Sequence, residues 1–171
     1  MSYYAFEEMK RAAGETPEDD MYACRQYTRA NEGYERKPYK DIKGHWTCGV
    51  GHKMLHPPTE DELKHGWSDD YIESIFEKDF IKACKSLSAA YPSWQKLSRG
   101  RRKALLDMSF NMGSVKGFKR MLKAVEGKDY DLAAWEIESS LYFSQLGGDP
   151  SGTDDGKDER PEKNARLMRM G

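Results

Sequence analysis

Apolar residues recur at helical spacing along most of the chain, which predicts a largely helical protein. The first such pattern covers residues 2–13 and ends at Gly14, as expected for a short amphipathic helix. Thr16 and Pro17 then form an N-cap followed by a proline at the first helical position. They predict a second helix that ends at or next to Glu32.

The pattern changes to that of a β-hairpin after this helix. Residues 46–50 alternate between apolar positions and small or polar ones, the period of a half-buried strand. Residues 34–41 precede it, and residues 42–45 between the two arms include Gly44 and predict a turn. Gly33 suits the left-handed position just past a helix end, so the hairpin should follow the helix directly.

Helical spacing returns with a capping box formed by Thr59 and Glu62, which predicts one or two helical turns. Ser68 then caps a longer helix that extends to about Ala89. At 1.5 Å per residue, a helix of this length can join two lobes. Its inward stripe is expected to consist of Ile72, Ile75, Phe76, Asp79 and Ala83.

The rest of the chain predicts short helices and one loop. The helices are expected over residues 93–97, 101–112, 118–125 and 130–141, and a last one starts at Pro161. Residues 146–159 are rich in Gly and Asp and have no apolar period, so they predict a loop. Their aspartates lack EF-hand spacing, so no calcium site is expected. The fold class is therefore α+β, mainly α.

Composition and charge narrow the function. The chain has 171 residues, one domain's length, and its net charge of −1 gives no global attraction for nucleic acid or an anionic membrane. The basic run at residues 99–103 is interpreted as the solvated start of a helix. No apolar run reaches the length of a signal peptide or a membrane span, so we expect synthesis in the cytoplasm without a signal peptide.

The cysteines and histidines do not predict a metal site. The cysteines are three in number and contain no Cys-x-x-Cys pair, so reduced, buried thiols are expected. The four histidines lack helical metal-ligand spacing. We therefore expect no metal and no cofactor.

Glu32, Asp41 and Thr47 are the candidate catalytic residues. A carboxylate at a helix end and two polar side chains on the arms of a hairpin can face one bond from two sides. The negative end of the helix dipole disfavours ionisation of Glu32, whereas Asp41 on an open arm should stay ionised. Two carboxyl groups in unlike environments can divide acid and base roles in glycoside hydrolysis. Taken singly, the three residues could equally be a surface acid, a turn former and a β-former.

The spacing of these three residues resembles that of the T-even phage lysozymes. Eight residues separate Glu32 from Asp41, and five separate Asp41 from Thr47. The closing sequence Gly-Val-Gly-His at residues 49–52 is similar as well, and residues 101–113 resemble that family's central helix in the C-terminal lobe. The resemblance covers roughly residues 21–169.

The resemblance implies a lysozyme-like fold of two lobes. It places a β-hairpin N-lobe at about residues 21–68, an interlobe helix at about 69–90 and a helical C-lobe at about 91–171, and leaves residues 1–20 as an extension helix and linker. It also implies that His52 on the hairpin side pairs with Asp79 on the interlobe helix.

The resemblance also implies an activity. The family hydrolyses the β-1,4 bond between N-acetylmuramic acid and N-acetylglucosamine in peptidoglycan with inversion, so Glu32 is expected to be the general acid, with Asp41 and Thr47 positioning the water. The implied enzyme is a monomer that lyses the host cell by acting on the periplasmic wall. The residues implied to bind substrate are Phe110, Gln145 and Lys163.

Lys163 marks a departure from the family's pattern. The family has Pro-x-Arg-x-x-Arg, in which the first arginine pairs with the catalytic glutamate, and residues 161–166 keep the second basic residue and carry Lys163 in place of the first. Lysine keeps the charge but loses the planar fork of donors. The loop at residues 146–159 is expected to lie near the cleft.

Two other functions stay open at this point. A lytic transglycosylase cleaves the same bond with one glutamate and no water, and an inactive peptidoglycan-binding or tail-structural module could keep the lysozyme fold. An enzyme of this kind could equally serve as a free endolysin, a tail-associated enzyme or a secreted effector.

Overall fold

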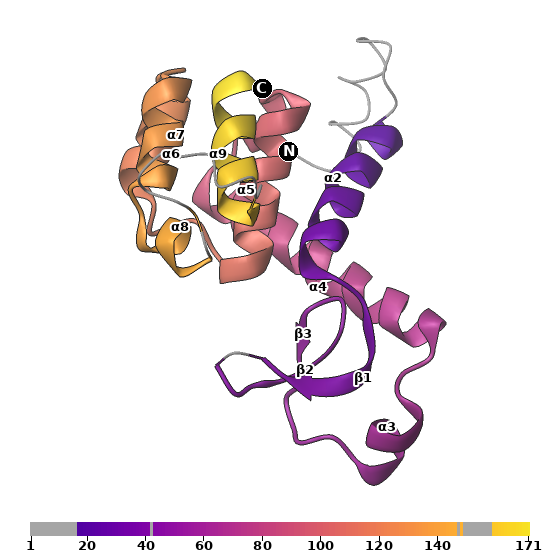
Figure 1. Cartoon of the computed structure of the whole chain (residues 1–171). Helices are drawn as coiled ribbons and strands as arrows, with labels where there is room; N and C mark the ends of the chain where they lie inside the picture. Colours follow the sequence, from indigo (N-terminus) through magenta and orange to yellow (C-terminus); the bar gives the residue numbers. More distant parts are fainter. Residues whose placement is uncertain (1–16, 42, 147, 149–158) are drawn as a thin grey trace.

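The computed structural model describes residues 17–41, 43–146, 148 and 159–171, which form a small sheet lobe and a helical lobe joined by a long helix (Figure 1). The helix expected at residues 2–13 lies outside the described residues. The elements in chain order are α2 (Pro17–Glu32), β1 (Glu35–Lys40), β2 (Trp46–Gly49), β3 (His52–Lys53), α3 (Glu60–His65), α4 (Asp69–Ala90), η1 (Trp94–Lys96), α5 (Arg99–Met112), α6 (Lys119–Glu126), α7 (Tyr130–Glu138), α8 (Leu141–Gln145) and α9 (Arg160–Met170).

Side-chain caps begin several helices where the sequence predicts them. Thr59 and Glu62 form the reciprocal capping box of α3, and Ser68 caps α4 by accepting a hydrogen bond from the Tyr71 amide. The single helix predicted over residues 130–141 is wrong. Ser140 accepts a hydrogen bond from a backbone amide and starts a separate helix, α8.

The sheet is antiparallel with β2 in the centre, between β1 and β3. Its central strand does not have the predicted half-buried alternation, because Thr47 and Gly49 are buried as well as Cys48. Helix α4 covers the face that was expected to be exposed: a Cβ at Gly49 would lie 3.2 Å from the Ile72 side chain. Gly49 has a φ of +66°, so both its backbone and its surroundings favour glycine.

Helix α4 connects the two lobes (Figure 1). It buries one stripe of side chains along its length. Ile72, Phe76 and Ala83 from the expected stripe are buried, and Phe80 and Leu87 join them. The expected contact between His52 and Asp79 is present, with 2.6 Å between the imidazole Nδ1 and a carboxylate oxygen. This contact ties β3 to α4.

The basic run at the start of α5 is only partly solvated, which corrects the sequence-based interpretation. Arg99 and Arg102 contact the carboxylate of Asp20 at 2.7 and 2.6 Å, and both Asp20 and Arg102 are almost completely buried. The guanidinium of Arg101 lies 3.4 Å from the centre of the Tyr130 ring. These arginines join α5 to α2 and to the rest of the helical lobe.

Packing places α2 with the helical lobe, since its main contacts are with α5, although the sequence groups residues 21–68 in the N-lobe. Cys24 and Cys48 are buried free thiols, and Cys84 is a half-buried one. None of the described helices is both long and apolar enough to cross a bilayer.

The buried contacts of Asp20 with Arg99 and Arg102 predict a large loss of stability when Asp20 is replaced. Asp20→Ala leaves the buried Arg102 without its carboxylate, so we expect the free energy of unfolding to fall by about 3 kcal/mol. Urea unfolding measures this. Asp61→Ala, which removes an exposed ion pair with His65, is the control and should cost less than about 1 kcal/mol. Equal losses in the two variants would contradict the role given to Asp20.

Candidate active site

Glu32 is the last residue of α2, and its side chain is 14% exposed. The turn after β2 packs directly against it. Gly51 has a φ of +64°, and a Cβ at this position would collide with the Glu32 carboxylate. The Gly-Val-Gly sequence therefore allows the sheet lobe to close over the acid.

The cation that pairs with Glu32 is Arg160 and not Lys163, which corrects the expectation from the sequence. Arg160 is the first residue of α9, and its Nη2 lies 2.7 Å from Oε1 of Glu32. The same guanidinium contacts the buried carboxylate of Asp107. Lys163 lies nearly one turn further along α9 and is half-buried. The planar fork expected to be lost is thus present, on a different residue.

The pKa of Glu32 is raised above its usual value. Burial is the largest cause, because it penalises the charged carboxylate. The charge of Arg160 and its hydrogen bond oppose the shift, as does a hydrogen bond with the Asn111 side chain, whereas the negative charge of Asp107 adds to it. The net upward shift of the pKa makes Glu32 hold its proton to higher pH than an ordinary glutamate, which suits a general acid.

Asp41 follows β1 and is held as an anion by the turn. Its Oδ1 accepts hydrogen bonds from the backbone amides of Lys43 and His45, each at 2.9 Å. The His45 ring nitrogen lies 3.3 Å from the other oxygen. The pKa of Asp41 is lowered, first by the His45 amide and then by the His45 side chain and the Lys43 amide.

Thr47 lies on β2 opposite Tyr39, and its hydroxyl donates a hydrogen bond of 3.3 Å to the carbonyl oxygen of His45. That carbonyl belongs to the turn that holds Asp41. The Thr47 side chain is nearly buried, so its hydroxyl is fixed, and its oxygen keeps acceptor capacity for a water.

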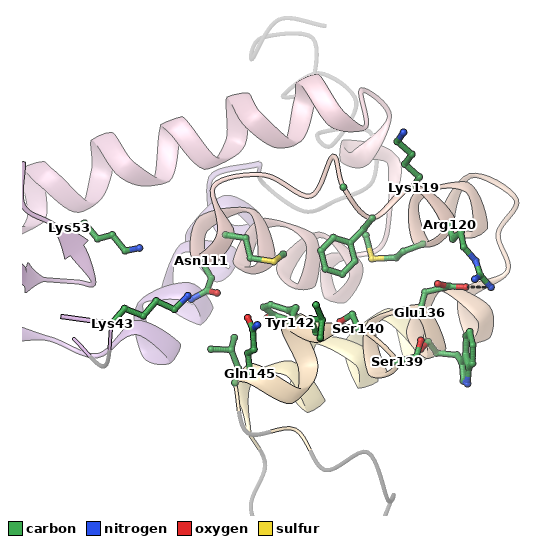
Figure 2. Close-up of a pocket in the computed structure, with 17 residues that line it drawn as sticks. Lys43, Lys53, Asn111, Lys119, Arg120, Glu136, Ser139, Ser140, Tyr142 and Gln145 are labelled. Atoms are coloured by element: carbon green, nitrogen blue, oxygen red, sulfur yellow. Dashed lines mark hydrogen bonds and ion pairs between the residues drawn. The ribbon is translucent and has the colours of Figure 1, made fainter. Parts of the chain in front are cut away.

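A cleft of about 1320 Å³ lies between the lobes. Figure 2 shows Lys43 and Lys53 entering it from the sheet lobe, opposite Asn111, Tyr142 and Gln145 from the helical lobe. Glu32, Asp41 and Thr47 are not among the described residues that line the cleft. Asn111 connects the cleft with the catalytic candidates, because it lines the cleft and also hydrogen-bonds Glu32.

The residues predicted to bind substrate are in different places. Gln145 lines the cleft. Phe110 and Lys163 are not among the described residues that line it, and Phe110 packs edge-to-face on Phe76 with 5.7 Å between the ring centres. For all three, substrate binding stays a prediction.

A family comparison agrees with this geometry. Residues 29–149 match the sequence model of the phage lysozyme family. The chain belongs to that family. Membership makes this phage lysozyme a glycoside hydrolase of the muramidase type. The matched residues contain Glu32, Asp41 and Thr47 but end before Arg160, so α9 lies outside the match.

Individual relatives are of two kinds. The chain is 31% identical over 138 residues to probable T4-type lysozyme 2 of Dictyostelium discoideum, covering 67% of this chain and 81% of that protein. It is 30% identical over 162 residues to the pre-baseplate central spike protein Gp5 of Enterobacteria phage T4, covering 81% of this chain. The aligned part spans only 28% of the spike protein's length.

Sequence reasoning missed His45 and Arg160 at this lysozyme's site. The first had a usable signal, because an aspartate that starts a turn accepts amide hydrogen bonds from the residues that follow. A histidine four residues on is then within reach. Arg160 had no such signal, since it follows a Gly- and Asp-rich stretch and precedes residues 161–166, which resemble the family's Pro-x-Arg-x-x-Arg motif.

The raised pKa of Glu32 predicts how stability depends on pH. With a raised folded-state pKa, its stabilisation is complete below the unfolded pKa and is lost as pH rises through the folded one. Glutamine mimics the protonated acid, so the stability gained by Glu32→Gln should grow over this pH range and then level off. Urea unfolding over a series of pH values measures the gain. Glu35→Gln, at an exposed carboxylate on β1, should show no such trend.

Proposed function

We propose that this phage lysozyme hydrolyses the β-1,4 bond between N-acetylmuramic acid and N-acetylglucosamine in peptidoglycan, with inversion of configuration. Glu32 is the general acid, Asp41 the general base, and Thr47 positions the attacking water with Asp41. The observation that carries this division of roles is the opposite pKa shifts of the two carboxyl groups. Groups whose pKa values are pushed apart are suited to opposite tasks.

The reaction needs one displacement. Glu32 donates its proton to the glycosidic oxygen as the bond to the anomeric carbon breaks. A water held between Asp41 and the Thr47 hydroxyl attacks that carbon from the opposite face, and Asp41 accepts the water's proton. Arg160 then faces a newly ionised Glu32 at 2.7 Å and stabilises it until it is protonated again.

In the cell, we place this reaction on the periplasmic wall, reached by an enzyme made in the host cytoplasm. The cleft supports an anionic polymer as substrate, because lysines from both lobes line it. The likeness to a central spike protein supports a second candidate, a structural role within a phage tail.

One assay separates the candidates. Chloroform-treated Gram-negative cells are incubated with the protein, turbidity is followed, and the released saccharides are analysed. Hydrolysis gives saccharides with free reducing ends, whereas a transglycosylase gives anhydro-sugars. A structural module gives neither product, and that result would overturn the proposal.

Glu32→Gln should remove most of the lytic activity. The variant keeps the shape of the side chain but cannot donate the proton, and general acid catalysis contributes roughly a hundred- to ten-thousandfold. Turbidity loss per unit of folded protein measures the effect. Glu35→Gln makes the same chemical substitution three residues away and should lyse within about twofold of wild type. A Glu32→Gln protein that retains a third of wild-type activity would contradict the acid role.

The stereochemistry of the product tests Asp41. If Asp41 activates water, the first product has the inverted anomeric configuration, whereas a nucleophilic carboxylate would give retention through a covalent intermediate. Proton NMR of the anomeric signals during early hydrolysis of a defined oligosaccharide distinguishes the two. Retention would exclude single displacement even if Glu32 is confirmed as the acid.

A further inference from the structure

A buried network of polar groups extends from Glu32 into the helical lobe. Its centre is Asp107, on α5, which has no exposed surface. The Asp107 carboxylate accepts hydrogen bonds from Nε of Arg160 at 2.7 Å, from Nη2 of Arg160 at 2.9 Å and from the Asn164 amide at 2.8 Å. A carboxylate with three such donors and no exposure is fixed in position.

The outer members of this network are neutral. The Asn164 amide also donates to the Tyr142 hydroxyl at 2.8 Å, and its oxygen accepts a hydrogen bond from the Tyr27 hydroxyl at 2.7 Å. Burial raises the pKa of both phenols far above their usual value, and the charge of Asp107 adds to the shift. The groups of the network that can carry a charge are therefore Glu32, Arg160 and Asp107.

The guanidinium of Arg160 thus contacts two carboxyl groups, and its contacts with the two differ. Asp107 accepts hydrogen bonds from two nitrogens of Arg160, whereas the nitrogen of Arg160 nearest to Glu32 is Nη2, which also donates to Asp107. If both carboxyl groups were ionised, the buried cluster would carry a net negative charge. A proton on one of them removes that charge, and Glu32 has the weaker hold on the cation.

We propose that Asp107 is a positioning residue of the glycosidase reaction, which holds Arg160 beside Glu32 and shares its charge so that Glu32 keeps its proton. The inference rests on the proposed function, in which Glu32 must be protonated to act. Asp107 touches no reacting atom and works through Arg160. Arg160 is also kept charged: burial lowers its pKa, but Asp107 and then Glu32 raise it by more.

The other groups that face Glu32 come from β1, α8 and α5. Tyr39 on β1 and Tyr142 on α8 are electrostatically coupled to Glu32, and each has a raised pKa and is neutral. Asn111 on α5 is an uncharged hydrogen-bond partner. After burial itself, the charge of Asp107 is the largest influence that raises the pKa of Glu32. Removal of this charge should therefore shift the titration of Glu32 downward.

The test is Asp107→Asn, with lysis rate measured as a function of pH. With Asp107 neutral, Arg160 is paired with Glu32 alone, so Glu32 should lose its proton at lower pH. The alkaline limb of the profile should move to lower pH, with lysis roughly three- to tenfold slower there and within about twofold of wild type on the acid side. A purely structural role would lower the rate equally at all pH values.

The matched control is Asp20→Asn. Asp20 is also buried, lies on the same helix as Glu32, and pairs with two arginines from α5. Its replacement should reduce stability without moving the alkaline limb. If Asp107→Asn does not fold, Asp107→Ser removes the same charge and leaves room for a water, and it should shift the limb in the same direction.

A second measurement keeps the inference separate from the proposed function. NMR titration of the Glu32 carboxyl carbon, in wild type and Asp107→Asn without substrate, needs no activity. A lower titration midpoint in the variant supports the coupling even if the wild-type protein proves inactive in the lysis assay, which would overturn only the proposed function. Unchanged midpoints, or a limb that moves as much in Asp20→Asn, would overturn the role of Asp107.

Discussion

The site depends on the contacts that the guanidinium of Arg160 makes with two carboxyl groups. This guanidinium joins the end of α2, the middle of α5 and the start of α9, because Glu32 and Asp107 both accept hydrogen bonds from it. Without this cation, two carboxyl groups would lie in the helical lobe with their main counter-charge removed. Buried ion pairs often stabilise a fold no more than hydrophobic residues of the same volume would. The cluster is therefore better explained by what it does to Glu32 than by stability alone.

Local signals in the sequence were sufficient for much of the fold. The caps at Thr59 and Ser68 predict where α3 and α4 begin, because each needs only a side chain and an amide three residues on. Glu32 was correctly placed at a helix end because the next residue, Gly33, takes the left-handed backbone conformation that often ends a helix, with a φ of +78°. The contact of His52 with Asp79 spans 27 residues, and only the family resemblance predicted it.

Predictions failed where distant packing decides the outcome. Alternation along β2 predicted one exposed face, but α4 packs against that face at Gly49, and Thr47 on the same face is buried as well. The basic run of α5 looked solvated because its partner, Asp20, lies 79 residues earlier than Arg99. The expectation for Lys163 failed for a related reason: the motif after the loop at residues 146–159 indicates a basic residue, whereas the start of α9 decides which basic side chain reaches Glu32.

The net charge of the chain does not describe the charge of the cleft. A value of −1 averages over the whole surface, whereas a substrate experiences the residues that line the cleft. The charged residues among the described lining are Lys43, Lys53, Lys119, Arg120 and Glu136, and the last two form an ion pair at 2.8 Å. Three lysines remain to give this surface a positive potential. An enzyme with almost no net charge can thus attract an anionic wall polymer to its cleft, and the attraction weakens with distance over about 10 Å at moderate salt.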